Sequence, residues 1–357
     1  ILIIIYALLI LTFITGMLKK FRKLSDDELP SISVVVAARN EENNIIDCLT
    51  SLDKLIFPEN KIEIIIVNDH STDKTEELIE KFIKDKPLFK TIIPTKQFKN
   101  VKGKANAIAN AIEISKGEII LTTDADCIVS PTWAKTIASY FKENIAMVGG
   151  YTNQVNKTIF GGMQSMDFLY LLGIAGGTIN HGKPLSCIGN NMSYRKSVYY
   201  EVGTYEAIPF SVTEDFQLLM AFHNLKKYKI IYPIDKDALV TSKPCPNVKT
   251  LYSQKKRWGV GGMKSDFAGY FVMGVGFANH LFMIISPFFF TPLTISILMT
   301  KILIDFIFLL AIHTKLRLRM KIIHFLAFEI YYIIYVLGLP FTLLFNRRVQ
   351  WKDRVFE

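Results

Sequence analysis

Apolar and polar positions divide the chain into three stretches. Residues 1–18 are almost continuously apolar, residues 267–345 are dominated by long apolar runs, and the sequence between them alternates short apolar runs with polar segments. A helix needs roughly 20 apolar residues to cross the hydrocarbon core of a bilayer. The first run therefore predicts a transmembrane helix over residues 1–18, and the whole pattern predicts a soluble domain flanked by membrane segments.

Between residues 31 and 123, short runs of β-branched residues alternate with segments of helical periodicity. The expected strands are residues 32–37, 62–67, 89–94 and 118–123. The expected helices are residues 42–55, a helix that Asp73 caps with Glu76 completing a capping box, and residues 103–116. Continuous β-branched strands separated by helices indicate a parallel sheet covered on both faces.

The pattern is less regular after residue 150. Four further elements are expected: an amphipathic or interfacial segment over residues 160–174, a strand over 188–195, a helix over 213–228, and a helix that contains residues 254–258. The strand is expected to return to the edge of the sheet where the polar residues gather.

Polar residues follow three of the expected strands directly. Arg39-Asn40-Glu41 follows the first strand, Asp69 follows the second, and Asp124-Ala125-Asp126 ends the fourth. Open α/β sheets bind ligands at the carboxyl ends of their strands. These groups are therefore expected to meet at one edge of the sheet.

The pair Asp124 and Asp126 has the chemistry of a cation site. Carboxylate oxygens are hard ligands that suit Mg²⁺ or Mn²⁺. A cation held in this way stabilises a departing diphosphate without proton transfer. The alternative is a strand-end turn in which Asp only hydrogen-bonds its own backbone, and the other acidic residues along the chain favour the metal.

Four landmarks follow one another along the chain. They are Asp69 in Val67–Ser71, Asp124-Ala125-Asp126, Thr213-Glu214-Asp215, and Gln254-Lys255-Lys256-Arg257-Trp258. This ordered set resembles the membrane-bound family 2 glycosyltransferases, which include cellulose, hyaluronan and poly-N-acetylglucosamine synthases and ceramide glucosyltransferase. The resemblance covers residues 31–258 and, less firmly, the apolar tail.

The resemblance implies an α/β fold of GT-A type, a Rossmann-like and mostly parallel sheet with helices on both faces, that binds a nucleotide-sugar, most often a UDP-sugar. Asp69 then corresponds to the aspartate that contacts the nucleoside, and Arg39 and Glu41 to the first nucleotide contacts. Many members carry an aromatic residue at the Arg39 position, so the identity of the base stays open. Lys104 resembles a lysine that contacts the diphosphate, and Lys102 is an equal candidate by charge.

Asp215 resembles the general base of the family. Inverting transfer needs a carboxylate that takes the proton of the acceptor hydroxyl while the sugar carbon is attacked from the opposite side. Glu214 is expected on the acceptor side. The alternative is that acidic residues in a first turn merely complement the helix dipole, which fits Glu214 better than Asp215.

The segment Gln254–Trp258 is the most specific of the four motifs. Gln254 and Arg257 are expected to contact the donor, because a guanidinium presents a fixed positive fork to a diphosphate. Trp258 offers an apolar platform for the acceptor sugar or lipid. The alternative is an interfacial Arg and Trp, both common at membrane surfaces.

The apolar tail predicts two to three membrane segments. Residues 293–312 form a good span, in which Lys301 and Asp305 can pair on one helix face. Residues 322–345 form another, whereas residues 267–290 are interrupted by glycines, Asn and His and either span or lie along the interface.

Two basic clusters, residues 315–321 and 347–352, leave the topology of this tail open. They cannot both be cytoplasmic if residues 322–345 cross only once. Either Gly338 and Pro340 break that segment into a re-entrant hairpin, or the first cluster is outside and residues 267–290 do not cross. The terminal Val349–Lys352 resembles a cytoplasmic tail of related enzymes, which favours the second arrangement.

The expected domains are a transmembrane helix at 1–18, a charged linker at 19–30, a glycosyltransferase domain at 31–262, a membrane region at 263–345 and a basic tail at 346–357. Lys19-Lys20-Phe21-Arg22-Lys23 follows the first span, which predicts a cytoplasmic domain on the plasma or inner membrane. The net charge of +10 lies largely beside apolar spans, where anionic lipids attract it. No nucleic-acid-binding signature accompanies the charge, and the four scattered cysteines indicate reduced cytosolic thiols.

The expected function is metal-dependent, inverting transfer of a sugar from a nucleotide-sugar to a membrane-associated lipid or a growing polysaccharide. The few expected spans favour a single lipid acceptor, or a processive synthase that needs a partner subunit for export. Two alternatives from other classes are a non-catalytic membrane scaffold, which predicts damaged motifs, and a nucleotidyltransferase, which gives no role to Trp258 or Asp215. A glycosidase leaves the metal and phosphate groups unexplained.

Overall fold

A computed structural model describes residues 1–209, 211–263, 265–345, 349–351 and 354–356. Contacts within the chain divide it into two units. The sheet unit comprises residues 19–153 and 187–243, and the helical unit comprises residues 1–18, 154–186 and 244–357. Two helices that the sequence boundaries assign to the domain of residues 31–262, at residues 159–180 and 248–262, therefore group with the apolar helices.

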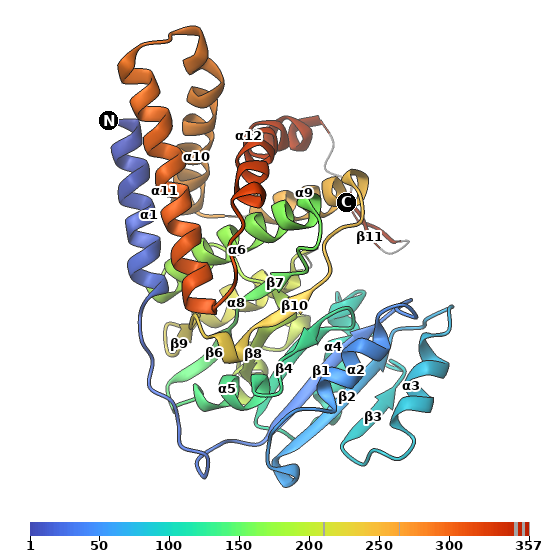
Figure 1. Cartoon of the computed structure of the whole chain (residues 1–357). Coiled ribbons are helices and arrows are strands. Elements are labelled where there is room, and N and C mark those ends of the chain that lie inside the picture. The colour runs from blue at the N-terminus through green and yellow to red at the C-terminus, as the bar shows by residue number, and fades with distance from the viewer. Residues whose placement is uncertain (210, 264, 346–348, 352–353, 357) are drawn as a thin grey trace. The chain divides into compact units, whose positions relative to one another are not determined.

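The sheet unit is built on a seven-stranded sheet of order β3-β2-β1-β4-β8-β6-β9 (Figure 1). Its strands are β1 Ile32–Ala38, β2 Ile62–Asn68, β3 Phe89–Ile92, β4 Ile119–Asp124, β6 Ile145–Gly149, β8 Met192–Arg195 and β9 Lys229–Ile231. The first four are parallel to one another, and β8 runs antiparallel to β4 and β6. The four predicted parallel strands are confirmed, as is the returning strand, which covers only the end of the predicted segment.

Helices connect these strands. In the sheet unit they are α2 Ile45–Leu52, α3 Thr75–Ile83, α4 Lys104–Ile114, α5 Trp133–Ser139, α7 Lys196–Glu201 and α8 Glu214–Asn224, with 3-10 turns η1 Glu59–Lys61, η2 Gly189–Asn191, η3 Tyr205–Ala207 and η4 Lys236–Ala238. A small sheet of order β5-β10-β7 adds Ile128–Val129, Val240–Ser242 and Thr152–Gln154.

Both faces of the sheet are covered, as the β-branched runs predict. Val34 and Ile64 belong to one buried cluster with Leu49 of α2 and Ile79 of α3. Successive side chains of a strand point to opposite faces, so the neighbouring buried positions face α4, which contacts β1 and β2. This coverage leaves the strand ends as the place where polar side chains gather.

The prediction at Asp73 is confirmed for the cap but not for the capping box. Helix α3 begins at Thr75, and within the described residues Glu76 completes no box. The Asp73 Oδ1 accepts from the backbone N–H of Thr75, the first residue of α3, at 3.0 Å. Its Oδ2 accepts from the backbone N–H of Glu42 at 3.1 Å and so joins the loops after β1 and β2, an interaction that local spacing does not reveal.

The helical unit contains α1 Leu2–Met17, α6 Ile159–Asn180, α9 Val248–Gly262, α10 Phe267–Ile285, η5 Ser286–Phe288, α11 Pro292–Leu316 and α12 Ile322–Phe345, and β11 Val349–Trp351 with β12 Arg354–Phe356. Within the described residues, three helical segments are long and apolar enough to cross a membrane: 267–288, 292–316 and 322–345. Helix α1 has 16 residues, roughly 24 Å at 1.5 Å per residue. The predicted basic tail lies partly outside the described residues, which omit 346–348, 352, 353 and 357.

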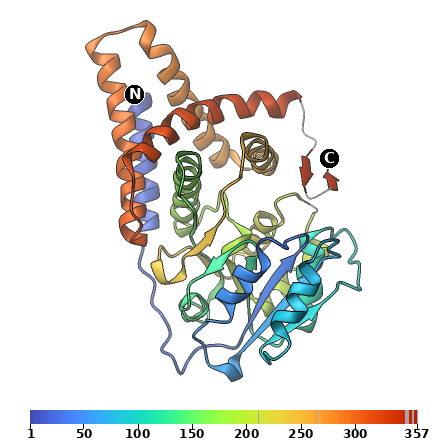
Figure 2. The ribbon, with the colours of Figure 1, turned by 45° about the vertical axis from the view of Figure 1, so that its right-hand side comes forward.

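Two features of this unit differ from the expectation. Helix α6 is buried around nearly its whole circumference, so it is not amphipathic. Helix α12 stays helical through Gly338 and Pro340, so it forms no re-entrant hairpin (Figure 2). Helices α10 and α11 form an antiparallel hairpin (Figure 1).

Candidate functional site

The carboxyl ends of β1, β2 and β4 lie at one edge of the sheet. Ala38 pairs with Asn68, and Ala37 pairs with Asp124, so the residues that follow these strands are neighbours. The Arg39 Nη1 donates to the backbone oxygen of Asp69 at 2.8 Å. The predicted meeting of the three strand ends is confirmed.

The loops after β1 and β2 are tied together by their side chains. The Glu41 backbone N–H donates to Thr75 Oγ1 at 2.7 Å, and the Asn40 backbone N–H donates to Ser71 Oγ at 3.1 Å. The Glu41 carboxylate accepts from Asn44 Nδ2 at 2.7 Å. Glu41 is therefore held in place by its neighbours at the edge where a nucleotide is expected.

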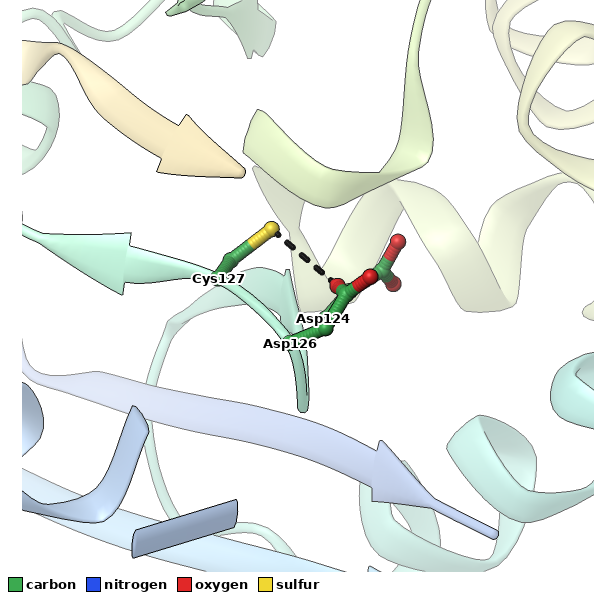
Figure 3. A group of neighbouring side chains, drawn as sticks. All are labelled: Asp124, Asp126 and Cys127. Atoms are coloured by element: carbon green, nitrogen blue, oxygen red, sulfur yellow. Dashed lines mark hydrogen bonds between the residues drawn. The ribbon is translucent and has the colours of Figure 1, made fainter. Parts of the chain in front are cut away.

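Asp124 and Asp126 form the candidate metal site with Cys127 beside them. One ligand atom from each of the three residues lies within 4.8 Å of the other two. Figure 3 shows the two carboxylates side by side and the thiol turned toward Asp126, to whose Oδ1 the Sγ donates at 3.5 Å. Burial, followed by the charges of Asp126 and Asp124, raises the pKa of the Cys127 thiol.

This donor set fits a hard divalent cation. The Cys127 thiol donates to Asp126, and the two carboxylates are the type of ligand that Mg²⁺ and Mn²⁺ prefer. A thiolate ligand would instead favour a softer metal. The sequence reading treats Cys127 only as a reduced thiol, and its contact with Asp126 becomes visible in the structure.

Lys104 is the predicted phosphate ligand that the structure brings to this edge. It opens α4 directly after Gly103, whose φ of 60° is a conformation that glycine adopts without steric cost. Its ammonium forms an ion pair with Asp124. Burial opposes the charge, but Asp124, Glu214 and Asp215 outweigh it and raise the pKa of Lys104 above its usual value. The ammonium is therefore a permanent positive charge among three carboxylates.

The other lysine, Lys102, lines a hollow that is open to solvent. Tyr205, Glu214 and Gln217 also line this hollow. Lys102 thus lies near the acidic end of α8, but the structure gives the ion pair with Asp124 to Lys104. The sequence alone could not separate these two lysines.

The Asp215 side chain lies against Gly189 of η2. It lies in the first turn of α8, which Thr213 precedes as N-cap residue. A side chain at Gly189 would meet the Asp215 carboxylate at 3.3 Å, and the Gly189 carbonyl accepts from Thr122 Oγ1 of β4 at 2.9 Å. Gly189 therefore leaves the space that lets Asp215 approach the end of β4, a role that sequence reasoning missed.

The last motif belongs to the other unit. Gln254, Arg257 and Trp258 lie on α9 of the helical unit. The Trp258 ring stacks on Phe168 with centroids 5.6 Å apart and an interplanar angle of 19°. One face of the indole is thus covered by Phe168, so the predicted acceptor platform has at most its other face and its edges available.

The sequence matches two family profiles. Residues 33–203 match "Glycosyl transferase family 2", and residues 119–346 match "Glycosyl transferase family group 2". Together they cover the sheet, the acidic motifs, α9 and the apolar helices α10, α11 and α12.

Two bacterial proteins are among the curated relatives of this chain. A probable glycosyltransferase, YdaM of Bacillus subtilis (strain 168), is 28% identical over 66% of this chain and 56% of its own length. The poly-beta-1,6-N-acetyl-D-glucosamine synthase of Staphylococcus aureus (strain MSSA476) is 30% identical over 69% of this chain and 58% of its own. The chain thus spans a little over half the length of the relatives it matches.

A solved structure resembles most of the chain. The mannosyltransferase PcManGT from Pyrobaculum calidifontis, in complex with GDP-Man and Mn²⁺, aligns with a TM-score of 0.61, 14% identity, and coverage of 96% of this chain and 94% of its own. At this identity the likeness concerns the fold, and it confirms the predicted GT-A type architecture.

Proposed function

The chain belongs to the family 2 glycosyltransferases, and on that premise we propose that it transfers a sugar from a nucleotide-sugar to a membrane-associated acceptor with inversion. The observation that carries the proposal is the gathering of Asp124, Asp126, Lys104 and Asp215 at the carboxyl edge of the sheet. This set combines a cation site, a fixed positive charge and a carboxylate base. The positive charge of Lys104 would bind the donor diphosphate, the cation would stabilise it as it leaves, and Asp215 would deprotonate the acceptor hydroxyl.

The donor diphosphate is proposed to lie against Lys104 and a divalent cation. Asp124 and Asp126 would hold Mg²⁺ or Mn²⁺, which would neutralise the charge that develops on the leaving diphosphate. The complex of PcManGT with Mn²⁺ supports a divalent metal. Arg39, Glu41 and Asp69 are proposed nucleoside contacts, and Gln254 and Arg257 are further proposed donor contacts.

Asp215 is the proposed general base. The acceptor hydroxyl oxygen forms a bond to the anomeric carbon, the bond to the diphosphate oxygen breaks on the opposite side, and the hydroxyl proton passes to the Asp215 carboxylate. Glu214 and Trp258 are the proposed acceptor contacts. A nucleotidyltransferase would leave Asp215 without this role, and an inactive scaffold gives no reason to keep all four motifs.

A growing polysaccharide is the proposed acceptor, and UDP-N-acetylglucosamine is the donor to test first. The name of the staphylococcal relative supports both. GDP-mannose is a second donor to test, because PcManGT binds GDP-Man. In addition, Arg39 stands where many members carry an aromatic residue that stacks on uracil. A partner subunit for export of the product stays a prediction.

The sheet unit is proposed to be cytoplasmic. In the helical unit Tyr6 contacts Asp305 and Phe13 contacts Phe308, so α1 and α11 run parallel and end on the same side. Basic residues follow both ends, at 19–23 and at 315–321, and positive charge favours the cytoplasmic side. This arrangement supports the topology in which residues 267–290 cross the membrane, against the preference stated from the tail sequence.

Radiolabel transfer tests the proposal. Membranes that contain the protein are incubated with Mn²⁺ and labelled UDP-N-acetylglucosamine, UDP-glucose, UDP-galactose or GDP-mannose, and products are divided into organic-soluble and high-molecular-weight fractions. We expect polymer label from UDP-N-acetylglucosamine that is lost with EDTA and in Asp215→Asn. Label in the organic fraction would show that the acceptor is a lipid and not a polysaccharide. If no donor gives Asp215-dependent label in either fraction, the proposed function is wrong.

A further inference from the structure

Two opposite charges are buried together in the helical unit. Lys255 of α9 and Asp167 of α6 form an ion pair, and their side chains are 4% and 2% exposed. Burial lowers the pKa of Lys255 and raises that of Asp167, although each charge favours the other. Well-packed apolar residues usually replace such a pair without loss of stability. Stability alone therefore does not explain why this pair is present.

The Lys255 ammonium lies over aromatic rings. Its Nζ is 4.4 Å from the centroid of the Trp258 ring and 4.9 Å from that of Tyr335. Lys255 and Trp258 are three residues apart on α9, so they share one face of the helix. A desolvated ammonium attracts the face of an indole more strongly than an exposed one does.

Asp167 is the residue that keeps this ammonium in place, and its neighbour completes the contact. Phe168, the next residue of α6, stacks on Trp258. The Trp258 indole is therefore held by α6 through a direct ring contact and through the Asp167–Lys255 pair. Trp258 itself is half-buried.

The ion pair leaves part of the hydrogen-bonding capacity of Asp167 unused. Among the described residues, the second carboxylate oxygen of Asp167, Oδ1, is buried with no hydrogen-bond partner. The hydroxyl of Tyr331, which stacks on Tyr335, is likewise buried without one. A buried carboxylate oxygen without a hydrogen bond lowers the free energy of unfolding. The pair therefore positions Lys255 at a cost in stability.

We propose that Asp167 and Lys255 are positioning residues that fix the orientation of the Trp258 indole for the acceptor. The inference rests on the proposed function, because the acceptor role of Trp258 belongs to it. Neither residue touches the reacting atoms. Lys255 acts through its ring contact with Trp258, and Asp167 acts through Lys255.

Kinetics of four variants test this inference: Asp167→Asn, Lys255→Met, the double variant, and Lys249→Met as a matched control. Lys249 is exposed on the same helix, so its replacement removes the same charge without touching the ring. We expect each of the first two variants to lower kcat/KM for the acceptor about 10- to 100-fold, the scale of a small misplacement, with a raised acceptor KM. Binding of UDP with Mn²⁺ should stay within about twofold, and Lys249→Met should behave as the parent.

The double variant separates positioning from stability. It removes both buried charges, so its Tm should return toward the parent value, whereas its acceptor KM should stay raised. Recovery of both quantities would show an ordinary structural pair and overturn the inference. Lys255→Arg keeps a cation over the ring and should restore most of the acceptor affinity.

A spectroscopic measurement makes the inference independent of turnover. The contribution of Trp258 is the difference in near-ultraviolet circular dichroism between each protein and its Trp258→Phe derivative. We expect this signal to shrink in the double variant and to be unchanged in Lys249→Met. An unchanged signal in the double variant would overturn the inference, even if no donor gave transfer and the proposed function itself had failed.

Discussion

Asp124 and Asp126 stand two residues apart but have different neighbours. Asp124 pairs with Lys104, and Asp126 accepts a hydrogen bond from Cys127. The spacing of the two aspartates predicts the pair, because both follow a strand end. The thiol contact is a matter of side-chain direction at a turn, which no periodicity in the sequence encodes.

Cys127 is expected to be a hydrogen-bond donor and not a metal ligand. Cys127→Ser keeps a donor toward Asp126, so Mn²⁺ affinity, measured by electron paramagnetic resonance of free Mn²⁺, should change by less than about threefold. The buried thiol, whose pKa is raised, should also resist maleimide in the native protein at pH 8. A loss of Mn²⁺ affinity of about tenfold or more in Cys127→Ser would make the sulfur a ligand.

Lys104 and Lys102 are expected to differ in their effect on the donor. Hydrogen bonds to charged groups contribute about 1.5–3 kcal/mol, so Lys104→Met should weaken UDP binding about 10- to 100-fold at saturating Mn²⁺. Lys102→Met removes the same charge at the neighbouring hollow and should weaken it much less. Calorimetric titration of both variants with UDP checks this, and equal losses would contradict the assignment of the diphosphate contact to Lys104.

At the scale of elements, Lys301 joins two apolar helices. It pairs with Asp305 one turn away on α11 at 2.7 Å and with Glu329 of α12 at 2.8 Å. Tyr170 of α6 also donates to Asp305 at 3.0 Å. The spacing of Lys301 and Asp305 predicts the first contact, whereas the partner on α12 depends on how two distant segments pack.

The burial of α6 and the contact of Asp73 with the loop after β1 could not be predicted from the sequence, for related reasons. Buried glycines such as Gly173 and Gly177 let α6 pack closely against Phe308 and Phe13. Both of these faces of α6 are therefore buried, and the helix has no polar face. Before α3, the Asp73 Oδ2 accepts from the backbone N–H of Glu42 in the loop after β1, while its Oδ1 caps the helix. The contacts of α6 and of the Asp73 Oδ2 are long-range contacts that a local pattern does not encode.

Lys301→Met is expected to destabilise the helical unit by about 3–5 kcal/mol, because it leaves two buried carboxylates without a counter-charge. Thermal unfolding in a fixed detergent should show a clearly lower Tm, with Lys315→Met, an exposed lysine of the same helix, unchanged. The triple variant Lys301→Met/Asp305→Asn/Glu329→Gln should recover part of the loss. Equal Tm values for Lys301→Met and the parent would show that Lys301 does not stabilise the helical unit.

At the scale of the whole molecule, the sequence predicts the kind of parts better than their grouping. The parallel sheet and the apolar helices follow from runs of β-branched residues and from long apolar stretches. The assignment of α6 and α9 to the helical unit does not, since their compositions are intermediate and their partners, α1 and α12, lie far away along the chain.

The proposed orientation predicts which turns face the cytoplasm. Phe289, at the exposed turn between α10 and α11, should be outside, and Arg319, at the exposed turn between α11 and α12, should be inside. With Cys187 and Cys245 replaced by Ser, Phe289→Cys should react with an impermeant maleimide in intact cells, and Arg319→Cys only after permeabilisation. The reverse pattern would place the sheet unit on the side without nucleotide-sugars.

The most direct test of the account compares Asp215→Asn with Glu214→Gln, which remove one charge each from adjacent positions of α8. For both purified variants, Mn²⁺-dependent UDP binding and sugar transfer are measured side by side. We expect Asp215→Asn to bind UDP like the parent and to lose transfer by about 10²- to 10⁴-fold, the usual contribution of a general base, with a much smaller loss in Glu214→Gln. Transfer by Asp215→Asn at a rate near that of the parent would contradict the assignment of the base, and with it the proposed chemistry of the site.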